Sequence, residues 1–174
     1  MDISLGLRWA FKNLQHLMLY GRRERTKMAK NGKLGWIDWE LFKQIRASMP
    51  LASVDILAIH QGRLLLMRRV NDPGRGVWFI PGGRIRYGET LNDAVLRELR
   101  EETSLIPVSM EVKGSMCHFW SDAHYVTTFF RIDVSGDIVC MNDEHDKYLW
   151  VSVLPDDTHP LVREMVERAG IFEK

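Results

Sequence analysis

Three carboxylates fall within one turn of a predicted helix in the middle of the chain: Glu98, Glu101 and Glu102. Residues three and four positions apart are neighbours on a helix, so these side chains crowd one side of a single turn. Like charges held this close cost free energy unless cations offset them. The adjacent Arg97 and Arg100 are one source of positive charge, and Mg²⁺, which prefers oxygen ligands, is another. Taken alone, the charge run is more typical of a solvated helix face.

The segment before this helix favours the metal explanation. Gly82 and Gly83 follow a short apolar stretch and precede Glu89 and the acidic helix. Glycine lets the backbone approach a phosphate or a metal ion closely. This order therefore allows a backbone carbonyl and several side-chain oxygens to converge on one cation. The combination predicts a divalent-metal site that handles an anionic substrate.

The elements that must position these residues follow from hydrophobic periodicity and turn signals. Alternating or apolar segments predict strands at 52–60, 63–70, 77–81, 108–120, 124–134 and 148–153. Helices are expected at 39–48, 90–104 and 161–168, and residues 82–89 are expected to form a glycine-rich loop. Trp78, Phe79, Phe119 and Trp120 are expected in the core or the pocket wall. Strands outnumber helices, which indicates an α+β fold with helices packed on a mixed sheet.

The composition narrows the class of protein. The 174 residues suit one domain with an appendage, and a hydrophobic share of 45% is enough to build a core. A charged share of 27% and a net charge of +1 argue against disorder and against a strongly basic nucleic-acid binder. Cys117 and Cys140 are expected to be reduced thiols in a cytoplasmic protein, with a single bridge as the alternative.

The charge is unevenly distributed along the chain. Residues 1–49 carry a net +6 and the remainder a net −5. Residues 1–37 are predicted to be a basic leader and linker ahead of a catalytic domain at 38–174. Apolar residues recur at helical spacing from Leu7 to Met18, which predicts an amphipathic helix.

The leader is compatible with three explanations. Its apolar stretch is too interrupted by charge for a transmembrane segment, and it lacks the cleavage pattern of a secretory signal. In the first explanation the helix lies on an anionic membrane surface as a peripheral contact. In the second it packs on the domain or on a partner subunit. Met28 as the true start would make the leader irrelevant.

The spacing of the glycines, the carboxylates and Arg97 resembles the signature of the Nudix hydrolases, G-x5-E-x7-R-E-U-x-E-E-x-G-U, in which U is aliphatic. The matching positions are Gly83, Glu89, Arg97, Glu98, Leu99, Glu101, Glu102 and Leu105. Ser104 is the single departure, where the signature has a glycine that serves the turn after the helix. The resemblance implies an α/β/α sandwich with a mixed sheet between helices, here with an N-terminal helical extension. It also implies hydrolysis of a nucleoside diphosphate linked to another moiety, with Mg²⁺ or Mn²⁺.

A closer similarity extends over residues 39–154. The segments PLASVDILA, GVWFIPGGRIRYGETL and NDEHDKYLW resemble those of GDP-mannose mannosyl hydrolases. These Nudix enzymes cut the bond between the anomeric carbon of the sugar and oxygen, and they release GDP and free sugar. The resemblance therefore implies a nucleotide-sugar substrate, GDP-mannose or GDP-glucose. Such enzymes are often dimers, so the resemblance also implies a homodimer.

The similarity assigns metal and proton-transfer roles. Gly82 matches the residue whose carbonyl oxygen binds the metal, and Glu102 matches the metal-binding carboxylate. Glu98, one turn earlier on the same helix, is a further expected metal ligand. Glu144 falls where those enzymes have a glutamine ligand, so a charged oxygen replaces a neutral one. His145 matches the general base that takes a proton from the attacking water, a role that suits a neutral imidazole.

The similarity also assigns substrate contacts. Asp55 and Arg69 match residues that contact the substrate and steady the leaving diphosphate, and Tyr125 matches a tyrosine near the pyrophosphate. An arginine guanidinium can contact two phosphate oxygens at once. Arg68 and Arg69 are consecutive in a predicted strand, so their side chains point to opposite faces and only one can reach the site. A structural pairing of Asp55 with Arg69 across the hairpin is the alternative.

The leading prediction is therefore hydrolysis to GDP and free sugar by water attack at the anomeric carbon, and the intact carboxylate set keeps cleavage between the phosphates as the alternative. The mannosyl hydrolases have a reduced box, whereas this chain keeps Glu98 and Glu101 as candidate catalytic carboxylates. A full box supports attack at phosphorus, as in a pyrophosphohydrolase that cleaves the P–O–P bond of a nucleotide sugar or a nucleoside triphosphate. His145 argues for cleavage at carbon unless it is an ordinary surface histidine. A third hypothesis is a non-catalytic module that binds a nucleotide.

Overall fold

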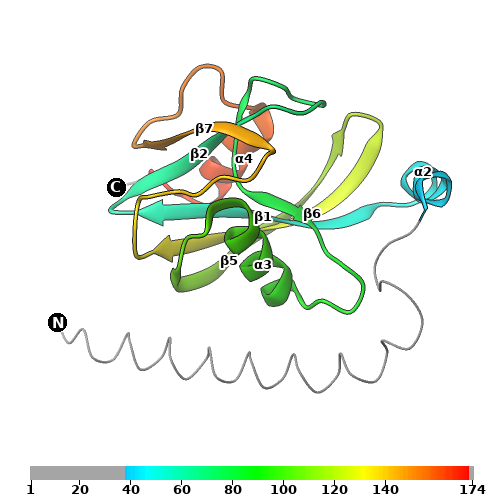
Figure 1. Cartoon of the computed structure of the whole chain (residues 1–174), viewed down its shortest axis with the longest axis horizontal. Coiled ribbons are helices and arrows are strands. Elements are labelled where there is room, and N and C mark those ends of the chain that lie inside the picture. The colour runs from blue at the N-terminus through cyan, green and yellow to red at the C-terminus, as the bar shows by residue number, and fades with distance from the viewer. Residues whose placement is uncertain (1–37, 173–174) are drawn as a thin grey trace. The chain divides into compact units, whose positions relative to one another are not determined.

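The computed structural model describes residues 38–172. A seven-stranded mixed sheet forms its centre, and helices pack on both faces (Figure 1). The helices are α2 (Trp39–Ser48), α3 (Leu91–Thr103) and α4 (Pro160–Arg168). The strands are β1 (Leu51–His60), β2 (Arg63–Arg69), β3 (Trp78–Phe79), β4 (Gly82–Arg84), β5 (Pro107–Trp120), β6 (Ala123–Val134) and β7 (His145–Val151). The expected α+β sandwich is confirmed.

The central strand β1 organises the sheet. The strand order is β3-β2-β1-β6-β5, with β4 also paired to β1 and β7 to β2. β1 pairs parallel with β6 and antiparallel with β2 and β4, so the sheet is mixed as expected. Successive side chains of a strand point to opposite faces. Accordingly Val54 and Ile56 pack with the apolar face of α3, whereas Leu57 and Ile59 pack with α4.

Helix α3 begins and ends where local signals place it. Thr90 Oγ1 accepts a hydrogen bond from the Asp93 N–H at 3.1 Å, and the Asp93 carboxylate accepts from the Thr90 N–H at 3.3 Å. This capping box satisfies backbone donors that the first turn leaves unpaired. The helix ends at Ser104, which has φ 58° and ψ 14°. That left-handed conformation costs a non-glycine residue about 1–2 kcal/mol, which explains why glycine is expected there.

Several sequence-based expectations are wrong in detail. Gly82–Arg84 form strand β4 rather than a loop, because Val54 of β1 and its neighbours offer them a pairing partner. β3 is confined to Trp78–Phe79. β7 starts earlier than predicted, at His145, because β2 supplies its backbone partner. Phe119 is 71% exposed and belongs neither to the core nor to a pocket wall. All these differences arise from strand pairing between distant segments.

The described residues include no helix long and apolar enough to cross a membrane. Cys117 and Cys140 are both exposed and carry free thiols. The predicted leader at 1–37, its amphipathic helix and Met28 lie outside the described residues.

Candidate active site

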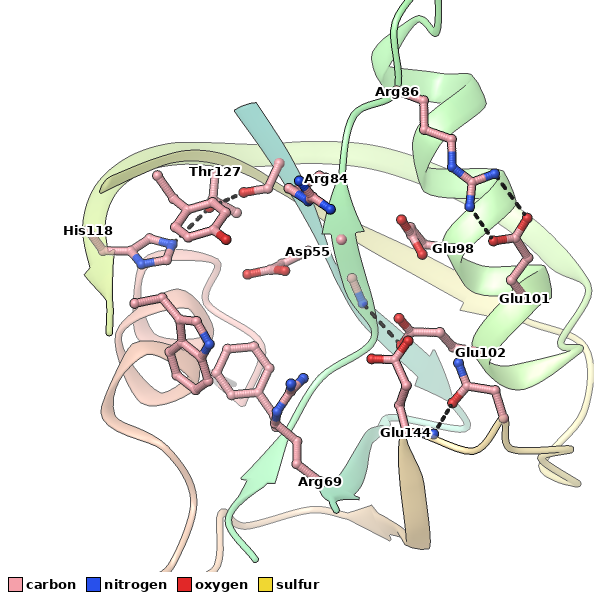
Figure 2. A pocket seen from close by; sticks show the side chains of 17 residues that line it. Asp55, Arg69, Arg84, Arg86, Glu98, Glu101, Glu102, His118, Thr127 and Glu144 are labelled. Atoms are coloured by element: carbon pink, nitrogen blue, oxygen red, sulfur yellow. Dashed lines mark hydrogen bonds and ion pairs between the residues drawn. The ribbon is translucent and has the colours of Figure 1, made fainter. Parts of the chain in front are cut away.

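A cavity of about 390 Å³ brings most of the predicted site residues together. This volume lies within the range of small-molecule sites. The lining residues come from strands β1 to β6, from α3, and from the segments that follow β4 and precede β7: Ser53, Asp55, Arg69, Phe79, Gly82, Gly83, Arg84, Arg86, Glu98, Glu101, Glu102, His118, Trp120, Tyr125, Thr127, Asn142 and Glu144. Figure 2 shows an acidic side with Glu98, Glu102 and Glu144, His118 on the opposite side, and Asp55 between them.

The acidic side holds buried like charges. Glu98 and Glu102 are 8% and 5% exposed, and the carboxylate of Glu144 faces that of Glu102 in Figure 2. Burial, together with the charges of Glu98 and Glu144, raises the pKa of Glu102 well above its usual range. The side chain of Glu102 accepts one hydrogen bond, a long one of 3.4 Å from the Gly82 N–H. This end of the cavity therefore favours a bound cation.

Arg97 ties the acidic helix to the segment before it. Its side chain is 8% exposed and donates to Glu89 at 2.6 and 2.9 Å, to Glu98 at 2.5 Å and to the Arg84 carbonyl at 3.0 Å. Burial opposes the charge of Arg97, but these bonds outweigh it and raise its pKa. Burial would also raise the pKa of Glu89, yet the bonds it accepts lower it. Burial keeps the pKa of Glu98 raised despite its bond with Arg97.

The two glycines are needed for close approach. A Cβ on Gly83 would lie 2.3 Å from Oε1 of Glu98, and a Cβ on Gly82 would lie 2.2 Å from Oδ1 of Asp55. Any side chain at either position would displace a carboxylate of the cavity. The glycines therefore let β4 pass directly beside these acids.

The donor set fits a hard divalent cation. Glu98, Glu102, Glu144 and the Gly82 carbonyl offer oxygen ligands, the type that Mg²⁺ and Mn²⁺ prefer. Within residues 38–172, no three acidic, histidine or cysteine side chains already stand in ligand geometry. Arg97 pairs with Glu98, but within the described residues no cationic side chain forms an ion pair with Glu102 or Glu144. A cation is the natural compensation.

Glu101 differs from its neighbours on the same turn. Its side chain is 41% exposed and forms an ion pair with Arg86 at 3.0 Å. Figure 2 shows its carboxylate directed toward Arg86. The sequence places Glu98, Glu101 and Glu102 together, but only Glu98 and Glu102 share the buried environment.

Asp55 and Arg69 both line the cavity, as expected. Asp55 is 8% exposed, and burial, with the charge of Glu98 in addition, raises its pKa to about 7, while Arg69 acts in the opposite direction. The two side chains form no ion pair within 4 Å, so the structural pairing across the hairpin is not formed. Arg69 lies over Trp120, with 5.7 Å from its Cζ to the ring centroid, whereas Arg68 pairs with Asp146 outside the cavity.

The side opposite the acids carries a polar chain that the sequence did not reveal. His118 Nε2 lies 2.8 Å from Thr127 Oγ1, which lies 2.6 Å from Ser53 Oγ. Tyr125, a predicted substrate contact, stacks on His118 with centroids 5.7 Å apart. Burial lowers the pKa of His118, so its imidazole is neutral at pH 7. Polar residues at every second position of β1, such as Ser53 and Asp55, were the available signal.

His145 is the predicted site residue that the structure leaves outside the cavity lining. It is 7% exposed, and its Nδ1 lies 3.2 Å from Oδ1 of Asn142. Burial, with the charge of Arg69 in addition, lowers its pKa to about 4. His145 pairs with Arg69 in the β2–β7 register, so it is next to the site in the sheet.

Arg84 was not singled out from the sequence, yet it lines the cavity. Its guanidinium stacks on Phe42 of α2, 4.3 Å from the ring centroid. Its position two residues after Gly82 in β4 was the only local signal.

Comparisons with known proteins find a family and related structures. A family model for the NUDIX domain matches residues 49–168. The low-salt glycan biosynthesis protein Agl8 of Haloferax volcanii is 33% identical over 139 residues, which cover 75% of this chain and 86% of that protein. The ADP-ribose pyrophosphatase of Methanocaldococcus jannaschii is 32% identical over 131 residues, covering 74% of this chain and 73% of that protein. The crystal structure of a MutT NUDIX hydrolase from Burkholderia pseudomallei superposes with a TM-score of 0.64 at 25% identity, covering 70% of this chain and 98% of that one.

Proposed function

This chain belongs to the Nudix family, and on that premise we propose that it hydrolyses a nucleoside diphosphate sugar by water attack at phosphorus, with a divalent cation. The observation that carries the proposal is one cavity that combines buried carboxylates with arginines that form no ion pair within the described residues. Glu98 and Glu102 lie at one end, and Arg69 and Arg84 lie on the walls. Such a cavity suits a diphosphate held between a cation and guanidinium groups.

Mg²⁺ or Mn²⁺ would be held by Glu102, Glu144 and the Gly82 carbonyl, which leaves Glu98 free of the cation. When bound, the cation supplies positive charge that offsets the charge of the diphosphate and the charge that develops during hydrolysis. Arg97 holds Glu98 in place through its 2.5 Å bond and leaves Glu102 to face the cavity. The Glu98 carboxylate is thereby fixed before any substrate arrives.

The chain itself provides diphosphate contacts and a proton acceptor. Arg69 and Arg84 are cavity cations that form no ion pair with a carboxylate within the described residues, so both can donate to phosphate oxygens. Burial raises the pKa of Glu98, which brings it closer to the range of a general base. Glu98 is therefore our candidate acceptor for the proton of the attacking water.

Two features favour phosphorus over carbon as the point of attack. The carboxylates Glu98, Glu101 and Glu102 are all present and all line the cavity. His145, the base expected for carbon attack, does not line it. Similarity to a glycan biosynthesis protein and to an ADP-ribose pyrophosphatase supports a nucleotide-sugar substrate. GDP-mannose, GDP-glucose and ADP-ribose are therefore the substrates to test first.

Product analysis in ¹⁸O-labelled water tests the proposal. The purified full chain is incubated with each of the three substrates and Mg²⁺ or Mn²⁺. We expect a nucleoside monophosphate and a sugar phosphate, with the label in a phosphate group. Glu98→Gln should lower kcat by about 10²-fold or more, as removal of a general base does. Absence of turnover on all three substrates with either metal would refute the proposal.

A second candidate is cleavage at the anomeric carbon, with GDP and free mannose or glucose as products. The observation that favours it is the position of His145, which is neutral near pH 7 and pairs with Arg69 in the sheet. In that case the label appears in the free sugar, and His145→Gln loses most of the activity. Full activity in His145→Gln would remove this residue from the reaction.

A further inference from the structure

Helix α2 contacts a side chain that belongs to the wall of the cavity. Arg84 lies in β4 and lines the cavity, and its guanidinium carbon is 4.3 Å from the ring centroid of Phe42 in α2. Within residues 38–172, no carboxylate forms an ion pair with Arg84. This distance is well inside the limit of a cation–π contact. Phe42 is therefore the neighbour that fixes Arg84.

α2 is anchored on the side of Phe42. Arg46, one turn after Phe42, forms an ion pair with Asp122 in the turn between β5 and β6, and its guanidinium lies 6.0 Å from the Phe42 ring. No residue of α2 is fully buried. The Arg46–Asp122 ion pair and the Phe42–Arg84 contact are therefore prominent among the contacts of this helix with the domain. The helix also precedes residues 49–168, the part of the chain that the family model covers.

An aromatic partner has a consequence that a carboxylate partner would not have. A carboxylate would neutralise the guanidinium and occupy its N–H groups. A ring binds the face of the guanidinium and leaves the donors at its edge available in the same plane. Arg84 consequently keeps both its charge and its donors for an anionic ligand in the cavity, while its long side chain loses freedom before the ligand binds.

We propose that Phe42 is a positioning residue that holds the Arg84 guanidinium in the cavity for a phosphate oxygen of the substrate. Helix α2 is then part of the binding site although it lies outside the family-matched region. The inference deepens the proposed function, and the identity of the substrate rests on that function. The binding of a diphosphate group does not depend on it.

The test measures binding and turnover separately. Phe42→Leu removes the ring and keeps an apolar side chain at a half-buried position. We expect the Kd for GDP, measured by calorimetry with Mg²⁺, and the KM for the turned-over substrate to rise about 2- to 30-fold, which corresponds to the usual strength of a cation–π contact. kcat should change less than KM. Phe42→Tyr, which keeps the ring, should restore both values.

A double-mutant cycle assigns the effect to Arg84. If Phe42 acts through Arg84, Phe42→Leu should have no further effect on the Kd in an Arg84→Gln background. An effect of Phe42→Leu that persists undiminished in that background overturns the proposal, as does a Phe42→Leu variant that binds GDP like the wild type. Met49→Ala is the matched control, because it truncates an exposed apolar residue just after α2, far from the ring contact; its Kd should match that of the wild type.

The outcomes separate the inference from the proposed function. A wild-type chain that hydrolyses no nucleotide sugar contradicts the proposed function, yet the GDP titrations still test the role of Phe42. If Phe42→Leu does not fold, Phe42→Trp provides the second variant, since indole forms the strongest cation–π contacts. It should bind GDP at least as tightly as the wild type, and a loss of affinity in a folded Phe42→Trp protein counts against the proposal.

Discussion

Glu102→Gln is expected to stabilise the metal-free protein while it weakens the response to metal. Glu102 is 5% exposed and accepts one long hydrogen bond from the Gly82 N–H. Glu98 and Glu144 add negative charge at the same end of the cavity. Glutamine keeps the shape and a carbonyl acceptor for Gly82 but removes the charge. The variant therefore isolates the cost of like-charge crowding.

The expected change in the free energy of unfolding is the difference between two opposing effects. Repulsion between neighbouring carboxylates contributes about 1–4 kcal/mol at an effective dielectric constant near 20. The buried amide NH₂ of glutamine needs an acceptor, and its absence costs about 1–3 kcal/mol. Because carboxylates of Glu98 and Glu144 are available as acceptors, we expect a net gain of about 1 kcal/mol. For a domain of this size the melting temperature in EDTA should then rise by about 4 °C.

The same variant should lose most of its stabilisation by metal. Wild-type protein at a metal concentration of 100 times Kd should gain about 2.7 kcal/mol by mass action. Glu102→Gln should gain less than half of this, because one charged ligand is missing. Thermal unfolding in EDTA and over a Mg²⁺ titration measures both effects.

Glu101→Gln is the matched control on the same helical turn. Its side chain is 41% exposed, its ion pair with Arg86 lies at the surface and its second ion pair, with Arg97, is long at 3.5 Å, so the change in stability in EDTA should be within about 1 kcal/mol. The reasoning is refuted if Glu102→Gln destabilises the metal-free protein more than Glu101→Gln does. It is also refuted if Mg²⁺ raises the melting temperature of Glu102→Gln as much as that of the wild type.

Three further predictions concern stability. Arg97→Leu leaves the acids around it without their buried partner and should lower the free energy of unfolding by about 3–5 kcal/mol in urea titrations; a loss below about 1 kcal/mol would contradict the network. Ser104→Gly should raise the free energy of unfolding by about 1 kcal/mol, because glycine adopts φ 58° without strain, and an unchanged urea midpoint would argue against strain there. His159 caps α4 by accepting the Leu161 N–H at its Nδ1, and burial, with the charges of His118 and Arg69 in addition, lowers its pKa below 6.5. Since the pKa of His159 is lower in the folded than in the unfolded chain, its contribution to stability is complete above pH 6.5 and is lost as the pH falls. His159→Asn keeps an acceptor for the helix cap and does not titrate, so it should reduce the slope of stability against pH between pH 5 and 7. An unchanged slope would exclude His159 as its source.

Local signals in the sequence predicted a large part of the fold. Helix α3 begins at the capping box of Thr90 and Asp93 and ends at Ser104, which is left-handed. Both ends were predictable because helix ends are decided by residues a few positions apart. The hairpin of β1 and β2 turns at Gln61 and Gly62, which both have positive φ. The carboxylates of the acidic helix were found for the same reason, since their spacing alone puts them on one turn.

Contacts between distant segments were beyond the reach of local signals. Ser53 and Thr127 are hydrogen-bonded at 2.6 Å only because β1 and β6 pair in parallel. Gly82–Arg84 became a strand only because β1 offered an edge. Phe42 and Arg84 are 42 positions apart and meet only in the folded chain, and no local pattern in the sequence indicates this contact.

The sequence by itself determined which chemistry is available here: oxygen ligands on a capped helix, close-approaching glycines and arginines on strands. Tertiary structure alone decided how these groups differ from one another. It buried Glu98 and Glu102 while leaving Glu101 more exposed and paired with Arg86, and it placed Arg69 in the cavity lining but not His145. The reason is physical, because residue type and spacing are written locally, whereas burial, and with it pKa and ligand access, depends on which distant strands pair.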